Sequence, residues 1–416
     1  MFERGRSVMP GSAKGAYFFP PFPLSMQRGE GCHLWDVDGH QYLDCANHHT
    51  AQILGHNHPK VIEVVQRQIQ RGVALGAPVG VETELAELLC QRVASLDKVR
   101  FCNSGTEATL HAIRLARGFT GRPKIAKFEG GYHGSHDVVE VSVAPPIDEA
   151  GPEDAPHSIA TTGGLSVNAP GEVVVLPYDN EQAVERLIEQ HRAELACVIL
   201  DPKAGIVSIR PQFVQAVRAI TKKHDVPMIL DEIVGFRVGS GGLQEHYGIQ
   251  PDLTTFGKIV GGGFPAGAFG GRADMMNLFD NSGPPTGMSQ SGTFSAHAVA
   301  MAAGLATLEQ MTPQAYAHLN GLGKQLRDGL TELFAKEGVA AQVVMLGSVF
   351  SIYFSDMPVT NYRALAQVKG DPDNRVFFAL LARGYYLAHG LGMNALSLPM
   401  QPDDIDGLVE AVGQSL

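Results

Sequence analysis

The apolar positions in the middle of the chain repeat at two different spacings. Five short apolar runs predict buried strands, at residues 99–102, 123–128, 172–176, 196–201 and 226–231. Apolar residues recur at helical spacing between and before these runs, at residues 59–72, 83–93, 107–117, 181–195 and 212–224. Because apolar strands that alternate with helices form a largely parallel sheet covered on both faces, this pattern predicts an α/β fold.

The two ends of the chain follow other patterns. Residues 1–30 are rich in proline and aromatic side chains, which predicts an extended arm, and residues 33–44 alternate around Asp38-Gly39 as in a β-hairpin. Beyond residue 306, helices and a strand pair at 342–354 indicate a smaller α+β domain. We therefore expect an arm with part of the small domain at 1–55, a large domain at 56–305 and the remaining small domain at 306–416.

Composition and charge exclude several classes of function. The 416 residues carry a formal net charge of -11 and contain no basic run, so nucleic acid is not an expected partner. No apolar window approaches the length of a membrane span, and the N-terminus lacks the apolar stretch of a secretory signal. The five cysteines lie far apart without a CxxC pair, which is typical of a reducing compartment. We expect a cytoplasmic protein that binds neither nucleic acid nor membrane.

The strongest chemical signal is a lysine without charged neighbours. Lys258 is the only charged residue between Asp252 and Arg272, in a segment of glycines and apolar residues. Burial lowers the pKa of an amine, and the neutral amine is the nucleophile that forms Schiff bases with aldehydes. Asp231 ends the apolar run at 226–231, and parallel sheets collect function at such strand ends. Because a buried carboxylate is costly unless it is paired, we expect Asp231 to have a partner.

Two more segments fit the same ligand. Ser104, Gly105 and Thr106 join a strand to a helix, where free amides and hydroxyls suit a phosphate, although a plain helix cap explains the same residues. Tyr132 lies in a glycine-rich loop and can stack on a flat ring. Pyridoxal 5′-phosphate requires all of these groups, because the lysine holds its aldehyde and the carboxylate keeps its pyridine nitrogen protonated.

The chain also resembles a known family over nearly its whole length. The motifs that carry the resemblance are Asn103-Ser-Gly-Thr-Glu-Ala108, Gly130-Gly-Tyr-His-Gly134, Asp231-Glu-Ile-Val-Gly-Phe-Arg237, Gly257-Lys-Ile-Val-Gly-Gly-Gly263 and Ser291-Gly-Thr293. They are similar to those of class III aminotransferases of fold type I, in the branch of β-amino-acid aminotransferases and glutamate-1-semialdehyde aminomutases. The resemblance implies a mostly parallel central sheet in a large domain, a smaller α+β domain, and a homodimer with a shared active site.

The resemblance also implies a role for each site residue. Lys258 would be the Schiff-base lysine and would move the proton between Cα and C4′, while Asp231 would pair with the pyridine nitrogen. Ile233 would pack under the ring and Tyr132 over it. The residues that would bind the phosphate are Ser104, Gly105, Thr106 and Thr293 of the partner subunit.

Three departures from the family pattern bear on the substrate. The segment after Asp231 is one residue shorter than the usual Asp-Glu-Val-x-Thr-Gly-Phe-Arg, and the usual Glu-Pro is Asp201-Pro202. Lys14 and His389-Gly390 occupy the places where β-amino-acid enzymes carry arginines for substrate carboxylates. The carboxylate clamp is therefore weakened or relocated, and the amino donor need not be a standard β-amino acid.

The activity expected from these observations is amino transfer from an amino acid or amine to a keto acid. A glutamate-1-semialdehyde-type 2,1-aminomutase and a PLP-dependent epimerase are the alternatives on the same scaffold. The long loop at 144–171 is either a lid over the site or a solvated excursion, and a lid would suit a mutase, which must retain its intermediate. From another class, His133, His136 and Asp137 could ligate a metal in a hydrolase, although no metal site is expected.

Overall fold

The computed structural model describes the chain except for residues 1, 11–22, 203–205, 281, 283–286 and 369–370. Lys14 and most of the predicted aromatic arm therefore lie outside the described residues. The chain forms two compact units. The larger unit consists of Lys60–Tyr316 and Val359–Gln367, and the smaller consists of Met1–Pro59, Ala317–Pro358 and Val368–Leu416.

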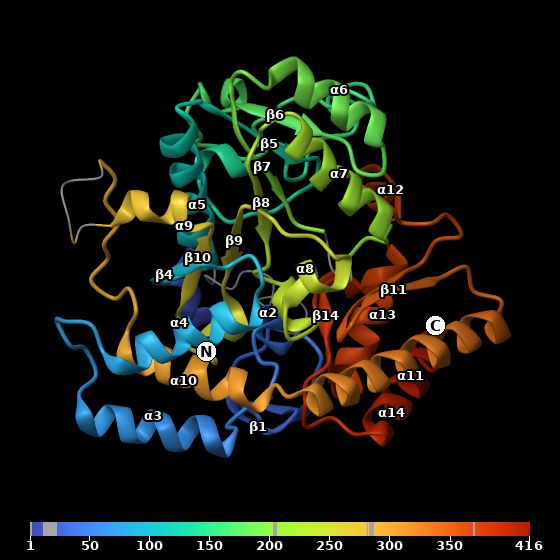
Figure 1. Ribbon diagram of the computed structural model, residues 1–416. Helices are drawn as coiled ribbons and strands as arrows, with labels where there is room; N and C mark the ends of the chain where they lie inside the picture. Colours follow the sequence, from blue (N-terminus) through green and yellow to red (C-terminus); the bar gives the residue numbers. More distant parts are fainter. Residues whose placement is uncertain (1, 11–22, 203–205, 281, 283–286, 369–370) are drawn as a thin grey trace. The chain divides into compact units, whose positions relative to one another are not determined.

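A seven-stranded sheet forms the centre of the larger unit (Figure 1). Its strand order is β4-β10-β9-β8-β7-β5-β6, and β10 alone runs antiparallel to its neighbours. The mostly parallel sheet expected from the sequence is thus confirmed. The strands are β4 (Lys98–Cys102), β5 (Lys124–Phe128), β6 (Val173–Leu176), β7 (Leu195–Leu200), β8 (Met228–Asp231), β9 (Leu253–Phe256) and β10 (Gly267–Gly271).

Helices cover this sheet on both faces because its strands are apolar on both sides. On β5, Ile125 belongs to a core cluster with Ala112 and Ala116 of α5, while Phe128 contacts Phe213 of α7 with ring centroids 5.8 Å apart. Figure 1 shows the strands between α5 on one side and α6 and α7 on the other. The helices of this unit are α3 (Pro59–Arg71), α4 (Gly80–Arg92), α5 (Gly105–Thr120), α6 (Glu181–His191), α7 (Pro211–Lys223), α8 (Gly242–Tyr247), α9 (Ala273–Met276), α10 (Ala298–Gln310) and α12 (Tyr362–Val368).

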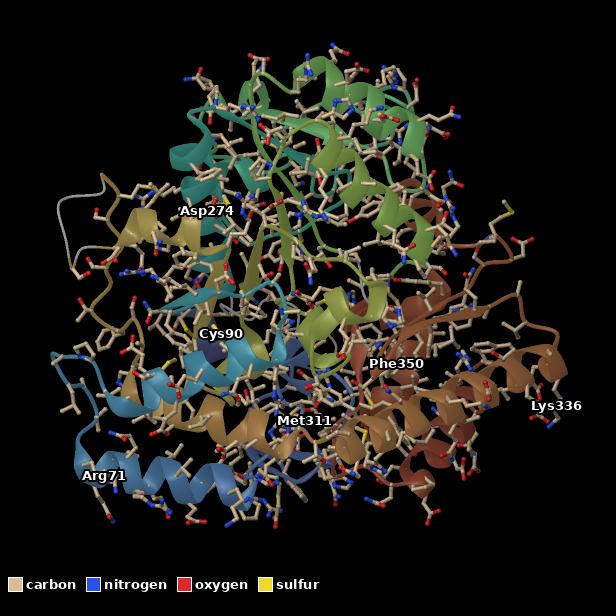
Figure 2. The ribbon with its side chains drawn as sticks, in the orientation of Figure 1. Arg71, Cys90, Asp274, Met311, Lys336 and Phe350 are labelled. Carbon is tan, nitrogen blue, oxygen red and sulfur yellow. The ribbon has the colours of Figure 1, made fainter. Side chains whose placement is uncertain are left out.

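The smaller unit contains two sheets, with strand orders β1-β2-β3-β13 and β11-β12-β14. The predicted hairpin is the antiparallel pair β2 and β3, and Phe350 on β12 is fully buried while Lys336 on α11 points into solvent (Figure 2). The strands are β1 (Met26–Glu30), β2 (His33–Asp36), β3 (Gln41–Asp44), β11 (Gln342–Leu346), β12 (Val349–Tyr353), β13 (Tyr385–Tyr386) and β14 (Asn394–Ala395). The helices are α1 (Phe2–Arg6), α2 (Asn47–Thr50), α11 (Pro313–Glu337), α13 (Asp371–Ala382) and α14 (Pro402–Gly413). Within the described ranges, no helix is both long and apolar enough to cross a membrane.

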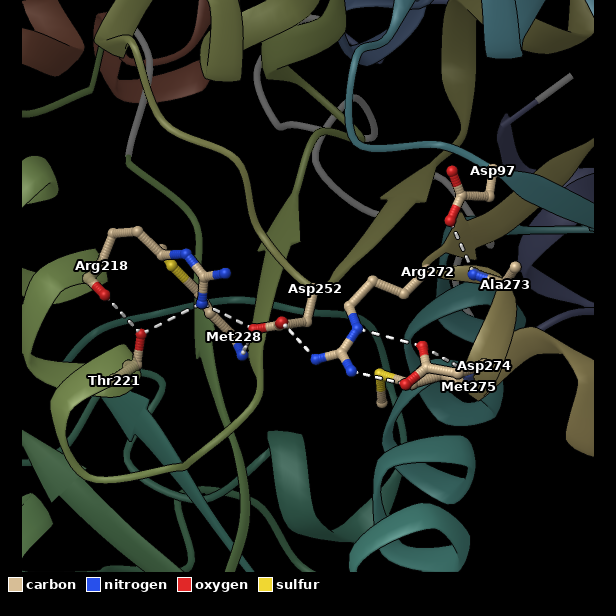
Figure 3. Close-up of polar contacts among 9 residues, drawn as sticks. All are labelled: Asp97, Arg218, Thr221, Met228, Asp252, Arg272, Ala273, Asp274 and Met275. Carbon is tan, nitrogen blue, oxygen red and sulfur yellow. Dashed lines mark hydrogen bonds and ion pairs between the residues drawn. The ribbon is translucent and has the colours of Figure 1, made fainter.

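A buried ion-pair network ties the central sheet together where β8 and β9 begin (Figure 3). Asp252 is only 6% exposed, and its Oδ2 accepts hydrogen bonds from Arg218 Nη1 at 2.6 Å and from the Met228 amide at 2.9 Å. Its Oδ1 accepts from Arg272 Nη1 at 3.0 Å. Burial alone would raise the pKa of Asp252, but the hydrogen bonds from Arg218 and Met228 outweigh it and lower the pKa on balance.

The loop at 144–171 is tied back to the large unit. The Ser142 amide donates to the Ile159 carbonyl at 2.7 Å, and Val141 forms an isolated bridge with Ala160. Ala150 is fully buried. The first part of this loop is therefore an ordered element of the large unit.

Arg363 on α12 also connects this loop to the large unit. Its Nε and Nη2 form a bidentate pair with the Glu129 carboxylate, both at 3.0 Å, and Glu129 is 5% exposed at the end of β5. The same guanidinium donates to the carbonyls of Gly151 at 2.8 Å and Ala150 at 3.1 Å. One side chain thus holds the loop against the segment that continues into Tyr132.

We expect the substitution Asp252→Asn to lower the free energy of unfolding by about 3 to 5 kcal/mol, because it leaves the buried Arg218 uncompensated. A carboxyl with a lowered folded pKa stabilises the fold above its ordinary pKa of about 3.9, and this contribution is lost as pH falls through the folded pKa. The difference between wild type and variant should therefore be full at neutral pH and shrink below about pH 4 in thermal unfolding. Asp274→Asn, which removes an exposed partner of Arg272, is the control and should cost under about 1 kcal/mol. Equal losses in both variants would contradict this account.

We expect Arg363→Gln to lower the unfolding free energy by about 3 kcal/mol and to increase hydrogen exchange in residues 144–160, because the buried Glu129 loses its partner. Arg186→Gln is the matched control, since Arg186 pairs with Asp154 of the same loop but both side chains are about half exposed or more. The control should change stability by less than about 1 kcal/mol. Unchanged exchange in the Arg363 variant would show that other contacts hold the loop.

Candidate active site

Four segments of the large unit end at one edge of the central sheet. Strands β4, β5, β8 and β9 run parallel to one another, so their carboxyl ends meet there. Ser104 follows β4, Tyr132 follows β5, Asp231 ends β8, and Lys258 follows β9. The parallel topology therefore brings together the four groups that the sequence suggested from positions far apart in the chain.

Lys258 has an unusual backbone conformation. Its φ is 52°, in the left-handed region that a residue other than glycine adopts only at a cost. This places it at the sharp turn from β9 into the short helix η5 (Lys258–Gly261). Burial lowers the pKa of its amine, while the charges of Asp231 and Asp201 act in the opposite direction. The turn thus presents an amine that is more readily neutral, and so more nucleophilic, than a lysine in solvent.

Three small or apolar residues connect this lysine with the start of α5. A Cβ atom added at Gly105 would lie 2.6 Å from Ile233 Cδ1, so a larger residue cannot occupy that position without displacing Ile233. A Cβ at Gly257, the neighbour of Lys258, would lie 3.4 Å from Ile233 Cγ2 and 3.5 Å from the Gly105 Cα. Gly105, Ile233 and Gly257 are therefore in mutual contact, as close backbone approach at a ligand site requires.

Asp231 is the buried carboxylate of the site, with 4% of its surface exposed. Its Oδ1 accepts a hydrogen bond from the Ile233 amide at 3.0 Å, and its Oδ2 lies 2.8 Å from His133 Nδ1. The expected partner of Asp231 is thus a histidine that the sequence suggested only as a metal ligand. His133 Nε2 is buried and has no hydrogen-bond partner in the described part of the chain.

The start of α5 is consistent with both predictions for this segment, a helix cap and a phosphate site. Ser104 is the N-cap, and its Oγ accepts from the Glu107 amide at 3.1 Å, so the plain cap is real. Its hydroxyl proton is still available to a ligand, as are the amides of Gly105 and Thr106 in the first turn, which have no acceptor within the helix. Thr106 packs closely against Gly134, where an added Cβ would lie 2.6 Å from Thr106 Oγ1. Backbone amides and two hydroxyls therefore converge where a phosphate would bind.

The other two predicted residues are exposed. Tyr132 has 54% of its surface exposed, and its hydroxyl lies 3.5 Å from Ser135 Oγ, so its ring is open to a stacking partner. Thr293 is also exposed, on a segment held beside β4 by the bond from Gln290 Nε2 to the Phe101 carbonyl at 3.2 Å. Among the described residues, no hydrogen bond joins Thr293 to the rest of the site.

Asp231 and Glu232 are adjacent in the sequence but have different roles in the structure. Glu232 is fully buried and accepts from the amides of Leu243 at 2.9 Å and Gln244 at 3.0 Å, at the start of α8. Burial raises the pKa of Glu232 to about 7, against the lowering effect of these amide bonds. Asp231 faces the site while Glu232 anchors α8, a division that the dipeptide alone did not reveal.

The histidines of the glycine-rich loop are engaged in bonds of their own. His136 Nε2 lies 3.3 Å from Thr109 Oγ1, and burial lowers the pKa of His136 to about 4. His133 is bonded to Asp231, so the geometry gives no support to a hydrolase with a metal on these two side chains. One of the suggested substrate-clamp residues, His389, lies in the smaller unit with its ring 5.2 Å from that of Phe377.

Comparison with known proteins assigns the family. The profile described as Aminotransferase class-III matches residues 18–397. The glutamate-1-semialdehyde 2,1-aminomutase of Methanocaldococcus jannaschii is 37% identical over 392 residues, which cover 93% of this chain and 90% of that protein. The corresponding protein of Methanothermobacter thermautotrophicus is 40% identical over 392 residues, with 93% and 90% covered.

Solved structures agree with the profile. An omega-transaminase from Sphaerobacter thermophilus has a TM-score of 0.94 and 42% identity, covering 100% of this chain and 96% of that chain. A β-phenylalanine aminotransferase from Variovorax paradoxus has a TM-score of 0.88 and 38% identity, covering 99% and 92%. A transaminase solved with PLP bound has a TM-score of 0.90 and 31% identity, covering 100% and 96%.

The residues present fit the cofactor of this family. Gly105 has no side chain at the start of α5, where the phosphate would bind, and two hydrogen bonds fix the buried carboxylate of Asp231. Lys258, whose pKa is lowered, follows the adjoining strand β9. The chain therefore belongs to the class III aminotransferases, enzymes that depend on pyridoxal 5′-phosphate.

Proposed function

We propose that this enzyme holds pyridoxal 5′-phosphate on the Nζ atom of Lys258 and transfers an amino group from an amino donor to a keto acid. The observation that carries the proposal is the position of Lys258. It occupies a left-handed turn at the end of β9, its pKa is lowered by burial, and the neighbouring strand end holds the buried Asp231.

When bound, the cofactor supplies an aldehyde that condenses with amines and a ring that accepts electrons from the carbon bearing the amino group. Lys258 Nζ would hold this aldehyde and, when free, would accept and return the proton that moves during amino transfer. A lowered pKa suits this task because the amine must be neutral to accept the proton.

Asp231 would keep the pyridine nitrogen of the cofactor protonated. His133 fixes one carboxylate oxygen at 2.8 Å and the Ile233 amide fixes the other at 3.0 Å, so the carboxylate keeps its orientation. Ile233 and Tyr132 would contact the ring, and Ser104, Gly105 and Thr106 would bind the phosphate.

We further propose a homodimer in which Thr293 of the partner subunit completes the phosphate site. The exposure of Thr293 and its lack of a hydrogen bond to its own site, within the described residues, support this arrangement. The unpaired cysteines support a cytoplasmic location, since all five are free thiols.

A 2,1-aminomutase is the second candidate. The relatives named glutamate-1-semialdehyde 2,1-aminomutase are 37% and 40% identical to this chain, close to the 42% of the omega-transaminase structure. Identity alone thus does not separate the two activities.

Dependence on a keto acid tests the proposed function. With an amino donor alone, the wild-type enzyme should change its cofactor absorption and stop after one half-reaction, and pyruvate or 2-oxoglutarate should allow continued turnover. Lys258→Ala should remain folded and lose at least about 1,000-fold in rate, or about 4 kcal/mol of barrier lowering. Steady turnover of the donor without a keto acid would contradict the transaminase and favour the mutase or epimerase. Wild-type activity of Lys258→Ala would refute the role of the lysine.

We expect Asp231→Asn to lower kcat by about 100-fold or more, or about 3 kcal/mol, because an amide does not keep the pyridine nitrogen protonated. The absorption of the bound cofactor should shift with it. Glu232→Gln is the matched control at the adjacent position, and it should lower the melting temperature while leaving that absorption unchanged. A variant at Asp231 with the wild-type rate and spectrum would remove this residue from the mechanism.

A further inference from the structure

Three potential metal ligands converge in the smaller unit, and none of them is among the residues assigned to the cofactor. Cys32 precedes β2, His33 begins it, and Asp404 lies in the first turn of α14. One ligand atom from each lies within 4.8 Å of the other two. This is the one such group of three or more His, Cys, Asp or Glu side chains among the residues that the structure describes.

The best-defined distance in this group fits a shared metal. Cys32 Sγ lies 3.6 Å from His33 Nδ1. Zinc bound tetrahedrally by sulfur at about 2.3 Å and nitrogen at about 2.0–2.1 Å places these two atoms roughly 3.5 Å apart. A hydrogen bond between the thiol and the imidazole has a similar length, so the argument for a metal depends on the nearby carboxylate as the third ligand.

The third ligand is already held in place. Asp404 Oδ2 accepts a hydrogen bond from the Gln401 amide at 2.8 Å, as part of the capping box of α14. A carboxylate that accepts one hydrogen bond still has lone pairs for a metal, and such outer bonds orient metal ligands in proteins. The group therefore needs little rearrangement to close around an ion.

The charges around Cys32 favour a cation. The carboxylates of Asp404 and Asp44 place negative charge near its thiol. A divalent cation reverses the local balance because it attracts the carboxylates and the thiolate alike.

We propose that Cys32, His33 and Asp404 form a binding site for a thiophilic divalent metal, of which Zn²⁺ is the best match. A thiolate, an imidazole and a carboxylate suit zinc, whereas magnesium and calcium prefer oxygen ligands only. Water completes the tetrahedron, because three protein ligands are present. The metal joins the strand that begins at residue 33 to the helix that begins at residue 402, and so links the two ends of the chain within the smaller unit.

The consequence of this site is stability and not catalysis. A ligand that binds the folded state alone raises the melting temperature once its free concentration exceeds its dissociation constant, and the effect grows with the logarithm of that concentration. Zinc should therefore stabilise the enzyme while the cofactor spectrum stays unchanged.

The test uses the full-length holoenzyme, freed of metal by a chelator and titrated with Zn²⁺ in a buffered series. We expect one equivalent of bound zinc by metal analysis after dialysis and a rise in melting temperature of several degrees. Cys32→Ser and Asp404→Asn should weaken binding at least tenfold. Cys90→Ser, at a half-buried cysteine on α4 labelled in Figure 2, and Asp403→Asn, at the exposed neighbour in the same turn, are the matched controls and should bind as wild type.

Cobalt gives a direct view of the ligands. Co²⁺ bound to the wild type should absorb in the red part of the visible spectrum with tetrahedral intensity, and Cys32→Ser should lose this band. Absence of stoichiometric zinc binding by the wild type, or equal binding by Cys32→Ser, would overturn the proposal. Because these readouts do not depend on turnover, they test the metal site independently of the proposed amino transfer.

Discussion

The hydrogen bond between His133 Nδ1 and Asp231 Oδ2 is the interaction on which the site depends. A carboxylate that is 4% exposed at a strand end would be costly without a partner, and its orientation would be free. His133 comes from the loop after β5 and Asp231 from the end of β8, so the bond also fixes two strand ends relative to each other. The Asp231 carboxylate, held in a fixed orientation near a lysine with a lowered pKa, distinguishes this edge of the sheet from an edge without a site.

Backbone packing supplies the second constraint. Gly105 and Gly257 both contact Ile233, and a Cβ at either position would meet its side chain. Gly105 at the start of α5, Ile233 two residues after Asp231, and Gly257 before Lys258 can approach only because two of the three lack side chains.

Ion pairs outside the site help to fix the strands and helices that make these contacts. Asp252 joins α7, the start of β8 and the segment after β10, while Arg363 joins α12 to the end of β5 and to the loop at 144–152. The carboxylates of Asp252 and Glu129 are buried, and a buried pair contributes most through the cost of breaking it. These pairs hold the start of β8, which ends at Asp231, and the end of β5, which continues into the loop of Tyr132.

The sequence by itself determined the alternation of strands and helices, the parallel sheet, and the residue types of the site, because apolar periodicity and strand-end position are local properties. Lys258 and Asp231 were evident from their unusual surroundings in the chain. The sequence did not indicate β9 and β10 on either side of the lysine, since short segments rich in glycine and threonine resemble a loop. Only the tertiary structure decided that His133 bonds to Asp231, that Glu232 anchors α8, and that Arg363 pairs with Glu129. Each of these pairings joins residues whose contact depends on how the strands are ordered, and strand order is not a local property of any segment.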